Sequence, residues 1–400
     1  MSNLSYLEKL LNGAEIELLP LSSLCKLITT GKLNANAMED NGAYPFFTCN
    51  KEPYRINTYA FDLEAILISG NGSQVGHLNY YNGKFNAYQR TYILGEFNEN
   101  VDIMYVYYYL MHTLKHYIHK NSKKGSVPYI TMPMLENFTF PIPCPDNPEK
   151  SLAIQSEIVR ILDKFTALTA ELTAELNMRE KQYNYYRDKL LSFDEEEVEW
   201  RAMGEIGVFT RGKRFVKADM LSEGVPCIHY GEMYTHYNVW ACVTKSFLNN
   251  DLAKKLRVAE HGDVIIVAAG ETIEDIGKGT AWLGQSDVVF HDACFSYRSP
   301  LNSKYIAYFT RTTVFHDQIK KHISSGKISA INANGLSKVK IPIPSDEEQA
   351  RIVAILDKFD ALTNSITEGL PREIELRQKQ YEYYRDLLLS FPQPPSDEVA

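Results

Sequence analysis

The chain has 400 residues, of which 44% are hydrophobic and 23% charged, and its formal net charge is −8. This length is enough for two or three domains with sizeable cores, and the composition is that of an ordinary soluble protein. No uncharged apolar stretch approaches the roughly 18 residues of a membrane span, and no basic start followed by an apolar core marks a signal peptide. We therefore expect a cytoplasmic protein with no membrane partner.

The cysteines indicate reduced thiols. They are scattered through a large chain, and none of the six belongs to a Cys-x-x-Cys pair. This argues against a disulfide framework and against a zinc site. The six are Cys25, Cys49, Cys144, Cys227, Cys242 and Cys294.

The net negative charge is unfavourable for a nucleic-acid binder, so its distribution matters. Residues 12–150 carry 11 basic and 13 acidic side chains, and residues 195–341 carry 18 and 17. Residues 342–400 carry 6 basic and 12 acidic side chains. The excess acid therefore lies toward the C-terminal end, and the two preceding regions are near neutral with local basic clusters.

Residues 1–150 are expected to form the first globular domain. Turn signals at Gly70-Asn71-Gly72 and Asn82-Gly83 separate apolar or alternating runs that predict strands. The pattern at 101–120 predicts an amphipathic helix that ends in basic residues and is followed by a polar loop. The predicted strands are 63–69, 75–80 and 88–94.

Residues 151–194 are expected to form one long helix. No Gly or Pro interrupts the segment, and apolar residues recur at steps of three and four from Ile158 to Leu190. Thr-Ala-Glu-Leu occurs twice in tandem at 169–176 and inserts a stutter into this heptad pattern. The segment is predicted to be a rod whose length changes in four-residue steps.

Residues 195–344 are expected to form a second globular domain that is a diverged copy of the first. Gly125 and Pro141 match Gly326 and Pro342 at an offset of 201 residues, and a helix is predicted at 303–322. Gly31-Lys32 likewise matches Gly212-Lys213. The predicted strands are 225–230, 263–268, 279–283 and 294–298.

Residues 345–391 are expected to form a second rod, followed by a flexible tail at 392–400. Residues 352–363 repeat ten of the twelve residues at 158–169, and residues 379–391 repeat eleven of the thirteen at 181–193. Gly369 and Pro371 predict a kink or short break in this copy.

Two long helices with similar seams most simply pack on each other in antiparallel fashion. The alternative is that each helix lies only on its own neighbouring domain. The N-terminal sequence also echoes the end of the first rod, so the repeat can close into a pseudo-two-fold arrangement. The predicted fold is α/β (α+β), with two globular domains joined by an antiparallel coiled-coil spacer.

The chain thus alternates variable unit, rod, variable unit, rod, which suits two different targets at a fixed separation on a linear object such as DNA. Pro-Ile-Pro precedes each rod, and a glutamine, Gln155 or Gln349, lies at the start of the rod that follows. The rods then share Ile-Val-x-Ile-Leu-Asp-Lys-Phe and Gln-Tyr-x-Tyr-Tyr-Arg-Asp. With the Thr-Ala-Glu-Leu repeats and residues 370–381, these motifs resemble the DNA specificity subunit of type I restriction-modification systems, of the IC-like subclass.

The resemblance implies two target-recognition domains, each reading one half of a split, asymmetric duplex DNA site. It implies two methyltransferase subunits docked on the rods, and restriction and translocase subunits in the full complex. S-adenosylmethionine, ATP and Mg would then belong to those partners, with no cofactor in this chain.

Basic clusters supply the predicted DNA contacts. A cluster ends each predicted helix and continues into the next loop, where cations and small polar residues can bind phosphates. An ordinary solvated helix end is the alternative. Arg and Gln elsewhere can read base edges. The predicted DNA-binding residues are Lys115, Lys120, Lys123, Lys124, Ser126, Tyr88, Gln89, Arg90, Arg211, Lys213, Arg214, Lys320, Lys321, Ser325 and Lys327.

No catalytic motif is found. The adenine-methyltransferase sequence Asn/Asp-Pro-Pro-Tyr/Phe and the Walker loop do not occur, and the Gly277–Thr280 segment is interpreted as a hairpin turn. His112, His116 and His119 lie at helical spacing but have no carboxylate or thiol partner in the pattern, so a basic surface is favoured over a metal site. We therefore predict a non-catalytic subunit.

Tyrosines near the end of each rod divide into two groups. Those on the heptad seam, Tyr183, Tyr186, Tyr381 and Tyr384, are expected in the core. The others point away from the seam with two arginines and are predicted to bind a partner, although simple exposure would also explain them. The predicted partner-binding residues are Tyr185, Arg187, Tyr383 and Arg385.

The alternative to DNA recognition is a coiled-coil protein scaffold that never contacts DNA. The near-neutral charge of the globular regions supports it. A self-contained methyltransferase is a third hypothesis, against which the missing motif argues.

Overall fold

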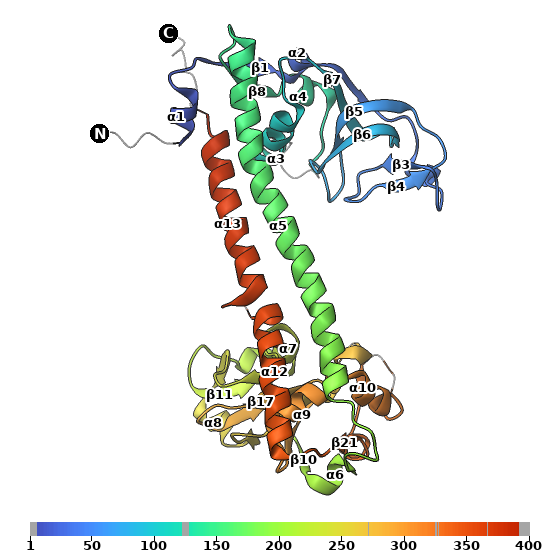
Figure 1. Ribbon diagram of the computed structural model, residues 1–400, viewed down its shortest axis with the longest axis vertical. Coiled ribbons are helices and arrows are strands. Elements are labelled where there is room, and N and C mark those ends of the chain that lie inside the picture. Colours follow the sequence, from blue (N-terminus) through green and yellow to red (C-terminus); the bar gives the residue numbers. More distant parts are fainter. Residues whose placement is uncertain are drawn as a thin grey trace, which may run out of the picture. The chain divides into compact units, whose positions relative to one another are not determined.

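The computed structural model describes residues 6–121, 128–270, 272–324, 326, 328–365 and 367–391 (Figure 1). The chain divides into two compact units. Unit 1 comprises Met1–Ala170 and Leu376–Ala400, and unit 2 comprises Glu171–Glu375. Within the described ranges, no helix is long and apolar enough to cross a membrane.

Unit 1 is built on a six-stranded sheet in the order β2-β7-β5-β6-β3-β4. Its central strand β5 is buried along Ala65–Ser69, with Ile66 packed in one core cluster and Leu67 in another. Helix α3 (Ile103–Asn121) packs in the same cluster as Ile66. The strands are β2 (Cys25–Thr30), β3 (Tyr44–Phe47), β4 (Tyr54–Ile56), β5 (Phe61–Ser69), β6 (Leu78–Ala87) and β7 (Thr91–Phe97).

Two local predictions in unit 1 are wrong. Asn82-Gly83 is not a turn but lies within β6, where it pairs with Glu64 and Leu63 of β5. Long-range strand pairing there overrides the local turn signal. Residues 88–90, predicted as strand, form a turn before β7.

Unit 2 repeats this plan with two sheets, in the orders β10-β19-β15-β17-β12 and β13-β11-β18-β14. Its central strand β15 is buried at every residue. The strands are β10 (Val208–Arg211), β11 (Val225–Ile228), β12 (Trp240–Ala241), β13 (Ser246–Leu248), β14 (Val258–Ala259), β15 (Val264–Val267), β17 (Gly279–Trp282), β18 (Val288–Phe290) and β19 (Cys294–Arg298).

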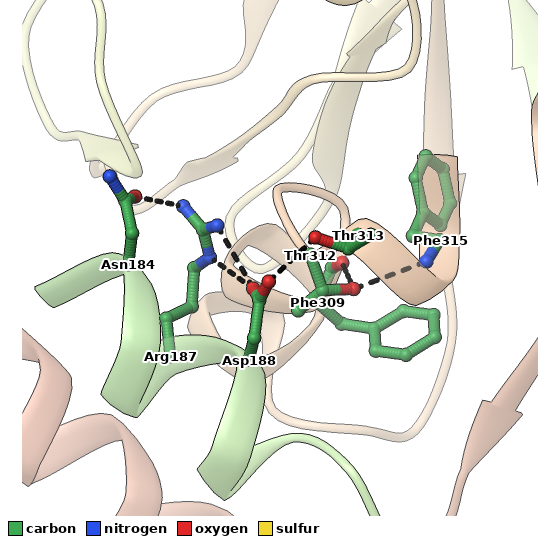
Figure 2. Close-up of polar contacts among 7 residues, drawn as sticks. All are labelled: Asn184, Arg187, Asp188, Phe309, Thr312, Thr313 and Phe315. Atoms are coloured by element: carbon green, nitrogen blue, oxygen red, sulfur yellow. Dashed lines mark hydrogen bonds and ion pairs between the residues drawn. The ribbon is translucent and has the colours of Figure 1, made fainter. Parts of the chain in front are cut away.

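The helix predicted at 303–322 is instead two helices, α9 (Ser303–Phe309) and α10 (Thr313–Lys320). The Thr312 hydroxyl accepts a hydrogen bond from the Phe315 amide at 3.2 Å, which starts a new helix at this point (Figure 2). The Gly277–Thr280 segment, predicted as a hairpin turn, contributes its last two residues to β17.

Short two-stranded ladders close each unit next to its rod. In unit 1, β1 (Ile16–Pro20) pairs with β8 (Thr139–Pro143). In unit 2, β9 (Trp200–Ala202) pairs with β21 (Lys340–Pro342). The first Pro-Ile-Pro segment therefore lies within a two-stranded ladder, where proline is tolerated, whereas the second begins at Pro342, the last residue of β21.

The first rod is the continuous 43-residue helix α5 (Pro148–Leu190). The second rod is divided into α12 (Asp346–Asn364) and α13 (Gly369–Leu389), which confirms the predicted break. Gly369 has φ +77°, and a Cβ on it would collide with the carbonyl oxygen of Ala361. Pro371 then falls in the first turn of α13, where its missing amide costs little.

Matching aromatic residues join the rods within each unit. Phe165 of α5 stacks on Tyr384 of α13 with ring centroids 5.2 Å apart in unit 1, and Tyr186 of α5 stacks on Phe359 of α12 at 5.6 Å in unit 2. Because α5 leads from unit 1 into unit 2 and the second rod leads back, the rods run antiparallel, as predicted.

One expectation about these rings is wrong. Tyr183 is buried, but Tyr186 and Tyr384 remain 41% and 38% exposed. Each ring stacks on one phenylalanine and meets the preceding tyrosine edge to face, and these contacts cover it only in part. They lie at the seam without entering the core.

The repeated glutamines attach each rod to its unit. The Gln155 Oε1 accepts from the Asp102 amide in unit 1, and the Gln349 Oε1 accepts from the Asn302 amide in unit 2, both at 2.9 Å. Both glutamines are buried. They fix the starts of α3 and α9 against the rods.

A repeated aspartate makes a second attachment. The hydroxyl of Tyr108 donates to Asp163 at 2.5 Å, and that of Tyr308 donates to Asp357 at 2.7 Å. The two rods therefore hold their units through the same residue types, although the units differ in sequence.

Candidate nucleic-acid interface

The same hydrogen-bonded turn precedes an inner strand in each unit. The Thr91 amide donates to the Tyr88 carbonyl at 2.8 Å in unit 1, and the Cys294 amide donates to the His291 carbonyl at 3.0 Å in unit 2. Strands β7 and β19 begin at Thr91 and Cys294. The two turns occupy equivalent places in the duplicated fold.

A glycine at the end of the edge strand packs against each turn. The Gly31 amide donates to the Thr91 carbonyl at 3.2 Å, and the Gly212 amide donates to the Cys294 carbonyl at 3.0 Å. A Cβ at Gly31 would collide with the carbonyl of Ala87, and one at Gly212 with that of His291. The sequence match between these glycines therefore reflects close backbone packing.

A second strand completes the frame in both units. The Tyr88 amide donates to the Phe47 carbonyl at 2.9 Å, and the His291 amide donates to that of Ile228 at 3.2 Å. The residues that follow these carbonyls therefore border the turn: Thr48 and Cys49 in unit 1, and His229 and Tyr230 in unit 2.

The end of the polar loop is tied to the same frame. The Gly70 amide donates to the Arg90 carbonyl at 2.9 Å, and the Ile130 amide donates to the Gly70 carbonyl at 2.9 Å. In unit 2, the Ala268 amide donates to the Ala293 carbonyl at 2.7 Å, and the Ile331 amide donates to the Ala268 carbonyl at 2.8 Å.

We call these surfaces the turn faces. They share a backbone frame and differ in side chains. The turn face of unit 1 comprises Gly31–Leu33, Thr48, Cys49 and Tyr88–Arg90, and that of unit 2 comprises Gly212–Arg214, His229, Tyr230 and His291–Ala293.

The residues predicted to contact bases belong to the two parts of the turn face, the turn itself and the glycine segment that packs against it. Tyr88-Gln89-Arg90 forms the turn of unit 1, with Gln89 and Arg90 exposed. Arg211, Lys213 and Arg214 belong to the glycine segment of unit 2, all exposed. Sequence reasoning found the turn in one unit and the glycine segment in the other.

Unpaired cations gather at the turn face of unit 2. The Arg211 Nε donates to the Asp292 carbonyl at 2.9 Å, and the Lys213 Nζ donates to that of Lys255 at 2.8 Å. Arg257 in turn donates to the Arg211 carbonyl at 2.6 Å. None of these four basic residues forms an ion pair within the described part of the chain. Sequence reasoning missed Lys255 and Arg257, since only tertiary contacts place them here.

The basic helix ends are only partly described. Lys115 and Lys120 are exposed on α3, and Lys320 and Lys321 are exposed at the end of α10. The Lys320 Nζ lies 3.2 Å from Asp317, which neutralises part of its charge. The predicted residues Lys123, Lys124, Ser126, Ser325 and Lys327 lie outside the described residues.

A cavity of about 450 Å³ in unit 2 adjoins the turn face. The rings of Tyr230, Tyr234 and His291 line it, together with Ala293 from the turn and Ile328 from the segment before β20 (Ser329–Ala330). The Tyr234 hydroxyl is engaged, donating to the Ala269 carbonyl at 2.9 Å. The region after α10 and the turn therefore border the same hollow.

The helical histidines of unit 1 have separate surroundings. The His112 Nδ1 lies 3.4 Å from an Asp386 oxygen, and the His119 Nδ1 lies 2.9 Å from the Lys115 carbonyl oxygen. Burial, then the charge of Arg385, lowers the pKa of His112. Among the described residues, no group of three His, Cys, Asp or Glu side chains is arranged to hold a metal ion.

The predicted partner-binding residues lie near the ends of the rods. Figure 2 shows Arg187 held by Asn184 and Asp188 on α5, while the Asp188 carboxylate also accepts from the Thr313 hydroxyl at 2.7 Å. Arg385 bonds Asp386 in the same way, at 2.7 Å.

The two groups differ in exposure. The Arg187 side chain is only 13% exposed, whereas Tyr185 and Tyr383 are 58% and 64% exposed. The tyrosines present open aromatic surface, while Arg187 is largely held within its own unit.

Comparison with known proteins identifies the family. The family described as "Type I restriction modification DNA specificity domain" matches residues 14–179 and again residues 195–376. The chain belongs to this family. The two matched segments contain the two turn faces, in agreement with the internal duplication.

Members of the family match along almost the whole chain. The EcoR124I/EcoR124II specificity subunit of Escherichia coli is 38% identical, covering 98% of this chain and 99% of its own. A putative type I specificity subunit of Haemophilus influenzae is 32% identical with the same coverage. These relatives are named as specificity subunits, which agrees with the resemblance drawn from the rods.

Solved structures have the same fold. The type I restriction-modification S subunit from M. genitalium aligns with a TM-score of 0.56 at 16% identity, covering 96% of this chain and 98% of its own. A chain from a structure of the type I R-M system aligns with a TM-score of 0.57 at 14% identity, covering 94% and 97%.

Proposed function

We propose that this chain reads a bipartite, asymmetric duplex DNA site, with the turn face of each unit reading one half-site. The observation that carries the proposal is that two turn faces share one hydrogen-bonded backbone frame and carry different side chains. A common frame gives both units the same way of approaching a duplex. Different side chains give each unit its own sequence preference.

The charge distribution supports this function. The basic residues of the unit 2 turn face have no carboxylate partner within the described chain, so they are available to phosphates. The net charge of −8 is concentrated elsewhere, with 12 acidic residues in 342–400. A local basic face on an acidic protein favours contact through that face.

We infer that the rods dock two methyltransferase subunits, and that restriction and translocase subunits complete the assembly. The near-identical rod sequences suit two copies of one partner. The exposed rings of Tyr185 and Tyr383, at matching positions, would contribute to each docking surface, with Arg187 and Arg385 beside them. Specificity subunits of E. coli and H. influenzae are relatives over nearly the full length.

On this proposal the chain is non-catalytic. S-adenosylmethionine, ATP and Mg would be bound by the partner subunits. Measuring S-adenosylmethionine binding to the purified chain alone, and then to the assembled complex, tests this division. Stoichiometric binding by the chain alone would contradict it.

A unit exchange tests the proposed function. Replacing residues 14–143 by the corresponding region of another family member, in cells that also express the modification subunits, is expected to change one half of the methylated sequence and leave the other half unchanged. Methylated positions would be mapped across the genome. A change in both halves, or no sequence-specific methylation by the parent complex, would contradict the proposal.

A length change in the first rod tests its role as a spacer. One Thr-Ala-Glu-Leu unit adds four residues, or about 6 Å of helix, which is about one to two base pairs at about 3.4 Å each. Deleting residues 173–176 is expected to shorten the gap between half-sites by that amount and keep both half-sites.

A variant of equal length is the control for this deletion. Replacing Thr173 by Ala keeps the number of residues and is expected to keep the gap. An unchanged gap in the deletion variant would contradict the spacer role.

A further inference from the structure

Each turn has two central residues that project from the shared frame. In both turns the amide of the fourth residue donates to the carbonyl of the first. The first central residues are Gln89 in unit 1 and Asp292 in unit 2, and the second are Arg90 and Ala293. Because the alanine side chain has no donor or acceptor, the first central position is the one that carries a hydrogen-bonding side chain in both units.

The main chain of this position is held in both units. The Gln89 amide donates to the Leu33 carbonyl at 2.9 Å, and the Asp292 carbonyl accepts from the Arg211 Nε at 2.9 Å. These contacts use main-chain atoms of the turn residue, so its side chain can change while the frame is kept. A fixed backbone with a variable side chain is what a residue that determines specificity requires.

Neither side chain is needed to build the turn. Aspartate is common in turns because its carboxylate can accept from a backbone amide two residues ahead. Within the described part of the chain, no backbone amide donates to the Asp292 carboxylate, and its one close polar neighbour is His291. The Gln89 side chain is exposed and forms no hydrogen bond with a described residue.

His291 does not neutralise the Asp292 carboxylate. One carboxylate oxygen lies 3.1 Å from the His291 Nδ1, but that nitrogen already accepts from the Ala293 amide at 3.1 Å. In the neutral ring Nδ1 therefore has no proton to donate. Burial lowers the pKa of His291, which keeps the ring neutral at pH 7. The carboxylate remains available as an acceptor, with its side chain 34% exposed.

Asp292 is an acidic residue on an otherwise basic surface. The other charged residues of the turn face are Lys213 and Arg214. Arg211 and Arg257 adjoin it, and neither forms an ion pair with Asp292 in the part of the chain that the structure describes. A carboxylate that faces phosphates is repelled by them unless it meets a hydrogen-bond donor. The donors in the major groove of a duplex are the amino groups of cytosine and adenine.

We propose that the first central residue of each turn reads a base, so that Asp292 selects cytosine in one half-site and Gln89 selects adenine in the other. This inference rests on the proposed function. A carboxylate accepts from N4 of cytosine, whereas guanine and thymine present acceptors that repel it and adenine places its N7 acceptor beside the amino group. A glutamine amide matches adenine, because it donates to N7 and accepts from N6.

An asparagine at position 292 tests the carboxylate with almost no change of size. Asp292→Asn removes the charge and adds a donor, so we expect the complex to lose about tenfold in preference for cytosine at one position, with adenine gaining. Methylated sites would be mapped in cells that express the complete complex. The half-site of unit 2 is the one that exchange of residues 14–143 leaves unchanged. Binding of the purified complex to duplexes with each base at that position repeats the measurement without methylation.

The reciprocal change is made in unit 1. Gln89→Glu places a carboxylate of similar size at the equivalent position of the same frame. We expect the preference for adenine at one position of the unit 1 half-site to fall by about tenfold and cytosine to gain. The half-site of unit 2 is expected to stay unchanged.

Asp287→Asn is the matched control. Asp287 is exposed and precedes β18, whereas Asp292 lies beyond the other end of the same strand. The substitution changes the net charge by the same amount and is expected to leave both half-sites unchanged. Thermal unfolding of each variant confirms that its units are folded.

Three results would overturn the inference. One is stronger binding of Asp292→Asn to all duplexes alike, as for an acid that only repels phosphates. The others are a changed preference at a position that is not cytosine in the unit 2 half-site or adenine in the unit 1 half-site, and an unchanged preference in either folded variant. Failure of the proposed function differs from all of these, because the parent complex would then methylate without sequence preference.

Discussion

The two units share their backbone contacts at the turn faces but differ in the side chains that project from them. In both units a glycine amide, a turn and a neighbouring strand are joined by equivalent hydrogen bonds. At the positions that border this frame, unit 1 has Thr48 and Tyr88 where unit 2 has His229 and His291. The difference shows that the fold constrains the frame tightly and leaves the exposed positions free to change.

The rods show the opposite pattern. Their sequences share two nearly identical blocks, and the same Gln and Asp side chains attach each unit. Yet α5 is continuous and the second rod breaks before Gly369. The two rods therefore present similar side chains, although only the second rod is interrupted before Gly369.

The largest expected effect comes from the frame glycines. Gly31→Ala and Gly212→Ala each place a Cβ against a backbone carbonyl that cannot move without breaking the turn. We expect a loss of about 3 kcal/mol or more in the unfolding free energy of the affected unit. Denaturant unfolding with hydrogen exchange assigned to each unit measures it.

Gly326→Ala is the matched control for these variants. Among the described residues, a Cβ there would meet the Ile328 carbonyl oxygen at 3.4 Å and no other atom within 4 Å. Equal loss of stability in all three variants would show that the frame has no special role.

The repeated aspartates are expected to have a smaller and unequal effect. Asp357 accepts from Tyr308 and also from the Lys304 Nζ at 2.8 Å, whereas Asp163 accepts from Tyr108 and has Met104 at the place of Lys304. We expect Asp357→Asn to cost about 1–2 kcal/mol and Asp163→Asn about 1 kcal/mol. Double-mutant cycles with Tyr308→Phe and Tyr108→Phe measure the free energy of the tyrosine–aspartate hydrogen bond in each unit. Equal losses of stability in the two aspartate variants would contradict the expected difference.

The smallest expected effect is the pH dependence that His112 gives to unit 1. His112, next to Asp386, takes the place that Thr313 occupies next to Asp188. Because burial and Arg385 lower the pKa of His112, the unfolded chain binds a proton as pH falls through about 6.5 while the folded unit resists it. Stability from this source is present above that pH and is lost as pH falls.

His112→Gln is expected to flatten the pH dependence of hydrogen exchange in α3 between about pH 5 and 7. Thr313→Ser changes no titrating group and is expected to leave the pH profile of α3 unchanged. An unchanged pH profile in the His112 variant would show that other groups control the response.

Sequence reasoning succeeded where the signal was repeated or periodic. The rods, the break near Gly369 and the duplication followed from spacing and internal similarity. It failed at Asn82-Gly83, where long-range strand pairing places the residues in β6. It also missed the N-cap at Thr312, where one predicted helix becomes two. It also placed Tyr186 and Tyr384 in the core, although both remain exposed.

The candidate site shows the same division. Tyr88–Arg90 and Arg211–Arg214 were singled out by their residue types. The sequence matched Gly31-Lys32 with Gly212-Lys213, but it did not show that the turns pack against these glycines, because the two turns differ in sequence and are joined to the glycines only by backbone hydrogen bonds. His229 and His291 were missed for the same reason, since they are 62 positions apart in the chain and meet only in the folded unit.

By itself, the sequence determined the order of unit, rod, unit, rod and the family to which that order belongs, because helical periodicity and tandem repeats are local properties of the chain. The tertiary structure alone decided which side chains share a surface. A turn face is assembled from segments far apart in sequence, and only strand pairing and the close approach of a glycine backbone bring them together.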